Sequence, residues 1–155
     1  VDTILEEYLA DAENMDYDYI IIDCSPSRGI VNDAILYYAD NLIIPVQLEA
    51  ASIKGIANIF EYLEELKIDS DKIKLIVPNM FDQRTNESKE NLQQLKEIFD
   101  NNIVSEPVHR RIRIAEATKV GKTIYEYDST AEEQFYDVLE RVVNIEWCIW
   151  QAKEK

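Results

Sequence analysis

Three short apolar runs without polar alternation set the fold class of this 155-residue chain. They are residues 19–23 (YIIID), 41–47 (NLIIPVQ) and 73–77 (IKLIV). Strands that are buried on both faces have this composition, and they are typical of parallel sheets. Helical patterns alternate with the three runs along the chain. The sequence therefore predicts an α/β fold, a doubly wound and mainly parallel sheet with helices on both faces.

The segments between the runs carry apolar residues at helical spacing. The expected helices cover residues 3–12, 29–39, 52–67, 87–99 and about 130–147, and residues 103–104 begin a short fourth strand. Asn86 is the expected N-cap of the fourth helix, and Ser129 with Glu132 forms a capping box for the last. The stretch after Pro107 reads as basic and irregular. Since no repeat or linker interrupts this order, we expect one domain over residues 1–155.

Polar residues follow the strands on the edge where such sheets bind their ligands. Ligands of doubly wound sheets lie at the carboxyl ends of the strands, and Asp23, Asn79 and Pro107 would all lie along that edge. Asp23 has three readings: the Mg²⁺-binding acid of a P-loop nucleotidase, the phospho-acceptor of a receiver domain, or a plain strand terminus. The receiver reading is disfavoured because no earlier strand supplies an acid pair and no lysine ends the run 73–77.

The glycines exclude a complete P-loop in this chain. That motif needs the spacing G-x-x-x-x-G-K-[ST], because backbone amides must wrap a phosphate without side chains in the way. The chain has only three glycines, and the segment VGKT at 120–123 has Glu116 where the first glycine should be. The sequence thus contains a strand-end acid without the loop that would hold the phosphates.

The charge and the apolar content of the chain limit the kinds of protein that it can be. The net charge of −15 gives no overall attraction to nucleic acid, so DNA binding needs a local patch. The basic residues of such a patch gather between positions 110 and 122: Arg110, Arg111, Arg113, Lys119 and Lys122, against one acid, Glu116. No apolar run approaches the roughly 20 residues of a membrane span. Two cysteines are typical of a protein of the reducing cytoplasm.

Three blocks of the sequence resemble the ParA/Soj partition ATPases, relatives of MinD in the deviant-Walker P-loop class. They are YDYIIIDCSPS with ADNLIIPVQLEAASIKGIANIFEYLEEL, then IVPNMFDQRTNES with LKEIF, and finally RIRIAEATKVGKTIYEYDSTAEEQFYDVLERV. The blocks follow the family's order from about Leu5 to Val143. The turn Ser25-Pro26-Ser27 departs from the usual Pro-Pro-Ser.

The resemblance implies cofactors and roles for particular residues. The family binds ATP and Mg²⁺ and dimerises around the nucleotide. By match, Asp23 is the Walker B acid, which holds Mg²⁺ through water, and Asn79 and Pro107 lie at the adenine-contacting edge. Arg84 and Arg113 match arginines that bind DNA without sequence preference. Arg110, Arg111 and Lys119 would be supporting charges.

The resemblance also implies that this chain is the C-terminal portion of such an ATPase, incomplete relative to the family fold. The parent would bind ATP, coat DNA as a homodimer and respond to a ParB-type centromere-binding partner, in the nucleoid-associated cytoplasm of a bacterium. We expect the chain alone to be inactive, because no group remains to neutralise the β- and γ-phosphates. The alternative is a non-catalytic interaction module, a degenerate ParA/MinD-like protein that has no ATPase activity.

Overall fold

The computed structural model describes residues 5, 7, 9, 17–25, 27–100 and 102–153, except for the side chains of residues 50, 51 and 146–153. The expected first helix, residues 3–12, lies almost wholly outside the described residues. The elements in chain order are α2 (Ile30–Tyr38), β1 (Leu42–Gln47), α3 (Ala50–Glu65), η1 (Ser70–Lys72), β2 (Ile73–Asn79), α4 (Asn86–Ile98), α5 (Ile112–Lys119), α6 (Ile124–Tyr127), η2 (Ser129–Ala131), η3 (Glu133–Phe135) and α7 (Tyr136–Lys153).

The two described strands form a parallel pair, β1 beside β2. On its other side, β2 makes a single bridge from Ile76 to Val104. Ile76 donates its N–H to Ile103 (2.6 Å) and accepts the N–H of Ser105 (3.0 Å). The predicted fourth strand is thus a single bridge, and the order across the sheet is β1, β2 and the segment 103–105.

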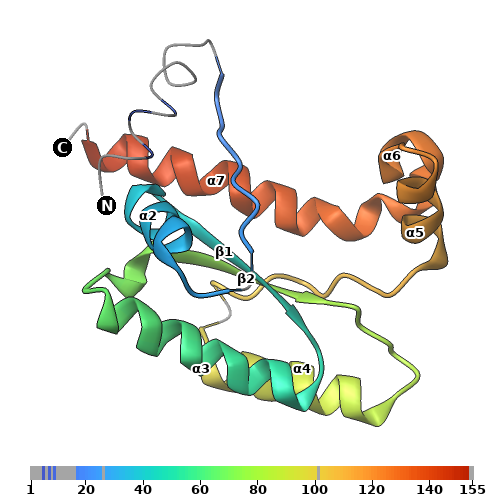
Figure 1. Ribbon diagram of the computed structural model, residues 1–155. Coiled ribbons are helices and arrows are strands. Elements are labelled where there is room, and N and C mark those ends of the chain that lie inside the picture. Colours follow the sequence, from blue (N-terminus) through green and yellow to red (C-terminus); the bar gives the residue numbers. More distant parts are fainter. Residues whose placement is uncertain are drawn as a thin grey trace.

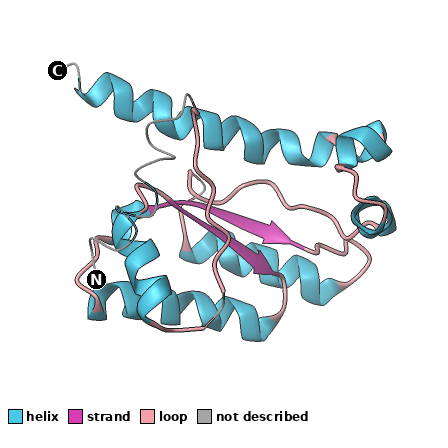
Figure 2. Cartoon of the chain, turned by 45° about the horizontal axis from the view of Figure 1, so that its top comes forward, coloured by secondary structure: helices cyan, strands magenta, loops and turns pink. Residues whose placement is uncertain are grey.

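Helices cover both faces of this sheet (Figures 1 and 2). On one face, α3 and α4 pack against the strands around a cluster of buried side chains that includes Ile44, Ile56, Ile76 and Leu95. On the other face, α7 packs over Leu75, Val77 and Val108, with Phe135, Val138 and Val142 closing the cluster. Strand β2 therefore sends alternate side chains into two helix layers, whereas the buried side chains of β1 face α3 and α4. The predicted α/β class is confirmed.

The far edge of β1 has no strand beside it among the described residues. Leu48 donates its N–H to Asn79 on β2, so by alternation the backbone groups of Ile43, Pro45 and Gln47 point away from β2. Proline lacks an N–H, and it is tolerated where that missing donor would face an open edge. Ile43 is 45% exposed on this strand, so the sheet ends here with an uncovered apolar side chain.

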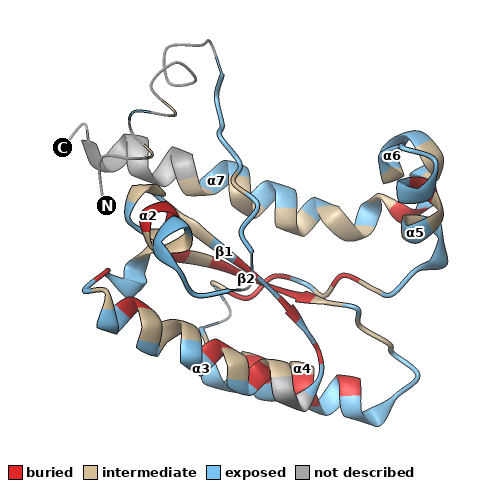
Figure 3. Cartoon of the chain, viewed as in Figure 1, coloured by how far each residue is buried: buried red, intermediate tan, exposed pale blue. Residues whose placement is uncertain are grey.

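The prediction of a buried strand at residues 19–23 is wrong for this structure. Residues 17–25 run in an extended path without strand pairing, and most are exposed (Figure 3). Ile21 is 92% exposed. A strand is buried on both faces only when neighbouring strands and two helix layers enclose it, and no described strand pairs with this segment. The apolar pattern indicated a segment that favours burial, but the described residues of the protein do not bury it.

Helix boundaries correct three further expectations. Thr85, and not Asn86, is the N-cap of α4, because its hydroxyl accepts the N–H of Ser88. The segment predicted to be irregular contains the helices α5 and α6. The capping box expected at Ser129 is found at the start of α6, where Thr123 and Glu126 exchange side-chain and backbone bonds.

The C-terminus of α2 is capped by a lysine from far along the chain. The ammonium group of Lys72 donates to the carbonyl oxygens of Leu36 (3.3 Å), Tyr37 (2.8 Å) and Ala39 (2.8 Å). Carbonyl groups at a helix end lack partners within the helix and carry partial negative charge. Lys72 satisfies them and ties α2 to the start of β2. No helix among the described residues combines the length and apolar character needed to cross a membrane.

Candidate functional site

The carboxyl end of β2 turns sharply at Met80, the residue after the strand. Met80 has a φ of 57°, a left-handed conformation that is costly for a side chain other than glycine, asparagine or aspartate. The side chain of Asn79 accepts the Met80 N–H (2.8 Å) and so holds the turn. Strained backbone of this kind gathers at functional sites, which makes this strand end a candidate site.

The turn places the loop after β2 against the segment that contains Pro107. Val108 donates its N–H to Pro78 (2.8 Å), Phe81 donates to Val108 (3.0 Å), and Arg110 donates to Phe81 (3.1 Å). The rings of Phe81 and His109 meet edge to face at 5.0 Å. The structure thus brings the neighbourhoods of Asn79 and Pro107 together, as their expected place on one sheet edge requires.

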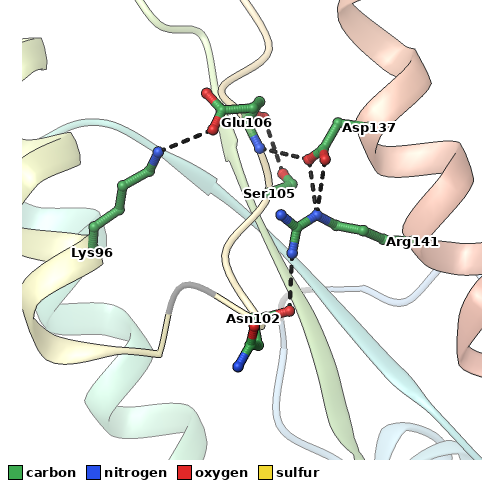
Figure 4. A network of polar contacts seen from close by, with 6 residues as sticks. All are labelled: Lys96, Asn102, Ser105, Glu106, Asp137 and Arg141. Carbon is green, nitrogen blue, oxygen red and sulfur yellow. Dashed lines mark hydrogen bonds and ion pairs between the residues drawn. The ribbon is translucent and has the colours of Figure 1, made fainter.

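Helix α7 fixes the outer side of the segment 102–106 (Figure 4). Asp137 accepts the Glu106 N–H (2.7 Å) and the Nε–H of Arg141 (2.9 Å), and Arg141 donates from Nη1 to the carbonyl of Asn102 (2.9 Å). Lys96 of α4 pairs with the Glu106 carboxylate (3.3 Å). Burial raises the pKa of Asp137, but the Glu106 N–H and Arg141 outweigh burial and leave that pKa lowered. The carboxylate therefore stays charged as a fixed acceptor.

Gln134 makes a similar contact just before α7 and was missed in the sequence. Its Oε1 accepts the N–H of His109 (2.9 Å), while its Nε2 is buried without a hydrogen-bond partner. Gln134 and Asp137 therefore occupy two outward N–H groups of the segment 105–110 with side chains. This contact leaves no sequence signal, since 25 residues separate the two partners.

Asp23 lies in the exposed segment 17–25, away from any strand pairing. The turn that follows it is held by α2, because the side-chain amide of Asn32 donates to the carbonyls of Ser25 (2.6 Å) and Ser27. The neighbouring thiol of Cys24 has a raised pKa, through burial first and the charge of Asp23 second. The residues after Asp23 are thus anchored to α2, while the segment before it pairs with no described strand.

The described residues do not by themselves fit a magnesium–nucleotide complex. Asp23 would be a single carboxylate ligand, and no group of three or more metal-ligating side chains gathers in the part of the chain that the structure describes. A triphosphate needs several converging donors, and Asn79 and Pro107 would offer only one edge of a base site.

Arg84 lies at the same end of the sheet, in the loop between β2 and α4. One edge of its guanidinium binds both carboxylate oxygens of Asp82, Nε to Oδ1 at 2.9 Å and Nη2 to Oδ2 at 2.6 Å. These bonds, with the Arg84 backbone N–H and a smaller effect from Arg110, hold the pKa of Asp82 well below its usual range. Arg84 is exposed and, in this conformation, paired.

Arg113 in α5 also contacts carboxylates. Its Nη1 donates to Glu116 (3.1 Å), and its Nε lies 3.6 Å from an oxygen of Asp128. Tyr127 donates its hydroxyl to the same Glu116 oxygen. The pKa of Asp128 is lowered, first by hydrogen bonds from Thr130 and more weakly by nearby arginine charge. α5 and α6 thus hold Arg113 in one orientation.

The three supporting cations are placed differently from Arg84 and Arg113. Arg110, Arg111 and Lys119 are exposed, and in the described part of the chain none of them has an ion pair within 4.0 Å. The loop after β2 and the helices α5 and α6 lie on the side to which the strands point (Figure 1). We call this surface, made of Arg84, Arg110, Arg111, Arg113 and Lys119, the basic end.

Comparison with known proteins finds related sequences and a related fold. A family model described as an AAA domain matches residues 1–77. The sporulation initiation inhibitor protein Soj of Bacillus subtilis is 31% identical over 137 residues, 85% of this chain and 54% of that protein. The chromosome partitioning protein ParA of Myxococcus xanthus is 33% identical over 116 residues, 73% of this chain and 41% of that protein.

A solved structure, that of Cyanthece apo McdA, superposes with a TM-score of 0.72. It is 23% identical, and the match covers 91% of this chain and 59% of that one, which supports the open parallel α/β fold. The chain spans about half the length of the curated relatives it matches. On the strength of the family model and these relatives, the chain belongs to the ParA/Soj-type family of partition ATPases.

Proposed function

We propose that this chain is the C-terminal portion of a ParA-type partition ATPase and that its own contribution is DNA binding without sequence preference. The observation that carries the proposal is the basic end, whose five cations belong to the loop after β2 and to α5 with the residues just before it. Both segments lie at the end of the sheet to which the strands point (Figure 1). Their positions on the loop after β2 and around α5 follow from the backbone bonds between Phe81, Val108 and Arg110. The relatives named for chromosome partitioning support the same proposal.

The chemistry of the basic end suits a phosphate backbone. Cations that neutralise phosphates release condensed counterions, so such binding weakens linearly on a logarithmic salt scale, by about 0.9 per contact. A net charge of −15 opposes DNA elsewhere on the molecule, so binding depends on a few well-placed cations. No base-reading element is needed for this mode of binding.

The wider activity of the parent is part of the proposal. Family membership supports the use of a nucleotide and Mg²⁺ by the intact protein, with Asp23 as the Walker B acid and Asn79 and Pro107 at the adenine edge. It also supports a ParB-type partner, homodimer formation and a place on the bacterial nucleoid. The chain alone should not turn over ATP. A metal-dependent ATPase activity that disappears in Asp23→Ala would contradict this expectation.

DNA binding is tested by fluorescence anisotropy with a labelled duplex of arbitrary sequence over a series of salt concentrations. The Arg84→Ala, Arg113→Ala double variant should bind several-fold more weakly and lose roughly two units of salt slope. Arg28→Ala is the matched control, because Arg28 is also exposed and ion-paired, to Glu65 at the far end of α3. Binding that is equally weakened in the control, or independent of salt, would refute the proposal.

The second candidate function is a non-catalytic interaction module. Two observations favour it: no described strand pairs with the far edge of β1, and the segment 17–25 exposes apolar side chains. Unpaired edges accept strands from other chains. DNA binding that is absent, together with a stable complex formed through this edge, would favour the module over the partition function.

A further inference from the structure

The loop between β2 and α4 contains an acid that binds one of the arginines proposed to contact DNA. Asp82 accepts three hydrogen bonds from Arg84: from Nε (2.9 Å), from Nη2 (2.6 Å) and from the backbone N–H (3.0 Å). A carboxylate and a phosphate bind a guanidinium through the same two-pronged geometry. In this conformation, Asp82 fills the place that a phosphate would take on this face of Arg84.

Asp82 is the fixed member of this pair. Its backbone N–H donates to the Ser88 hydroxyl (3.2 Å), and its carbonyl accepts bonds from the N–H and the hydroxyl of Thr85, both at 3.1 Å. Its side chain is 26% exposed, against 84% for Arg84. The arginine can therefore turn outward into solvent while the carboxylate stays within the loop.

The second cation near Asp82 is Arg110, which the backbone bond from Arg110 to Phe81 holds against this loop. Asp82 therefore places a negative charge within the basic end, close to two of its arginines. An aspartate carboxyl group is ionised at neutral pH, and the pKa of Asp82 is lowered further below its ordinary value. A DNA phosphate that approaches Arg84 meets both the competing carboxylate and its repulsion.

We propose that Asp82 competes with the phosphates of duplex DNA for Arg84 and so determines the affinity of the basic end. The proposal rests on the proposed function and adds its regulation by a built-in acid. Exposed ion pairs are weak, so the continuous phosphates of a duplex displace Asp82 when Arg110, Arg111 and Arg113 bind neighbouring groups. The acid keeps binding weak enough to be reversible.

The test compares four proteins with the wild type in the anisotropy assay: Asp82→Asn, Arg84→Ala, the double variant of these two, and Glu65→Gln. Asp82→Asn should bind the duplex about fivefold more tightly, the effect of one charge at ~4 Å in water, with a salt slope steeper by roughly one. In the Arg84→Ala background, most of the gain should vanish. Glu65→Gln makes the same charge change at the ion pair with Arg28 and should bind as the wild type does.

Each outcome decides between competition and its alternatives. If Asp82→Asn binds the duplex no more tightly than Glu65→Gln does, the inference is overturned. If Asp82→Asn binds more weakly than the wild type, the role of Asp82 is to position Arg84 for binding. A gain that survives in the double variant would assign the effect to general charge. If the wild type fails to bind and Asp82→Asn binds, the competition holds and the proposed function of the wild type is wrong. If neither binds, both are wrong.

Discussion

Arg84 stabilises the ionised form of Asp82 and so lowers the pKa of this carboxyl group. The folded-state pKa lies below the ordinary value of 3.8, so the pair stabilises the fold at neutral pH and loses this effect as the pH falls below that value. Arg84→Ala should raise the titration midpoint of Asp82 toward 3.8. Carbon-detected NMR of the carboxyl group measures this midpoint, and Arg28→Ala is the control. An unchanged midpoint in Arg84→Ala would show that the loop backbone, and not the guanidinium, sets the pKa.

At the residue scale, the sequence indicated the cations but not their partners. Arg84 and Arg113 were predicted from the family resemblance, and both lie at the basic end. Their roles in DNA binding stay predictions. The contact between Arg113 and Asp128 joins residues that are distant in sequence, so only the folded arrangement of α5 and α6 reveals it. Gln134 could not be found for the same reason.

Single polar contacts stabilise individual elements of the fold, and a substitution can remove each contact. Lys72→Met should lower the free energy of unfolding by about 1–2 kcal/mol, because three carbonyl groups at the end of α2 lose their cation. Urea denaturation followed by circular dichroism measures the change. Lys54→Met, an exposed lysine within α3, should change stability by less than about 0.5 kcal/mol. Equal losses in the two variants would contradict the capping role.

The bond from Asp137 to Glu106 makes a second prediction for an element, helix α7. Asp137→Ala should cost about 2 kcal/mol of stability, since it leaves Arg141 and a backbone N–H without their shared acceptor. The amide of Glu106 should also exchange with solvent much faster. Glu140→Ala, on an exposed position of the same helix, is the control. Unchanged exchange at Glu106 would show that the bridge of Val104 to β2 fixes the segment alone.

Elements with a clear apolar face were predictable, and the others were not. Residues 52–67 were expected to be helical, and α3 covers Ala50–Glu65 because Ile56 and Leu63 are buried at helical spacing. α5 was missed because Ile112 and Val120 are exposed and only Ala117 is buried. The strand predicted at residues 19–23 was wrong for the opposite reason. Their apolar composition is that of a buried strand, but burial also depends on neighbours that a local pattern does not contain.

For the molecule as a whole, the exposed apolar surface predicts self-association. Tyr17, Ile20 and Ile21 are exposed near the start of the described chain, and contacts between copies would cover such side chains. Sedimentation velocity should show association that increases with protein concentration. Ile21→Lys should reduce it, whereas Ile98→Lys, at another exposed isoleucine on α4, should not. A clean monomer at high concentration would refute this prediction.

The class of the whole molecule was easier to predict than its completeness. Alternating strands and helices sufficed for the α/β class, because few arrangements bury both faces of parallel strands. The expected place of Asn79 and Pro107 on one sheet edge agrees with the bonds around Phe81. Asp23 was expected on that same edge, but its segment pairs with no described strand. The role of Asp23 as the Mg²⁺-binding acid depends on more than the described strands, and it stays a prediction.

The two edges of this sheet differ in whether their outward backbone N–H groups already have partners. On one side, Asp137 and Gln134 already bind the outward N–H groups of Glu106 and His109, so an added strand would find those donors taken. On the other side, β1 has no neighbouring strand among the described residues, and one donor is missing at Pro45. Any polypeptide supplied in trans to complete the fold, as in a split-protein complementation experiment, therefore has one docking direction: it must join at β1, and its ladder must tolerate a single gap opposite the proline.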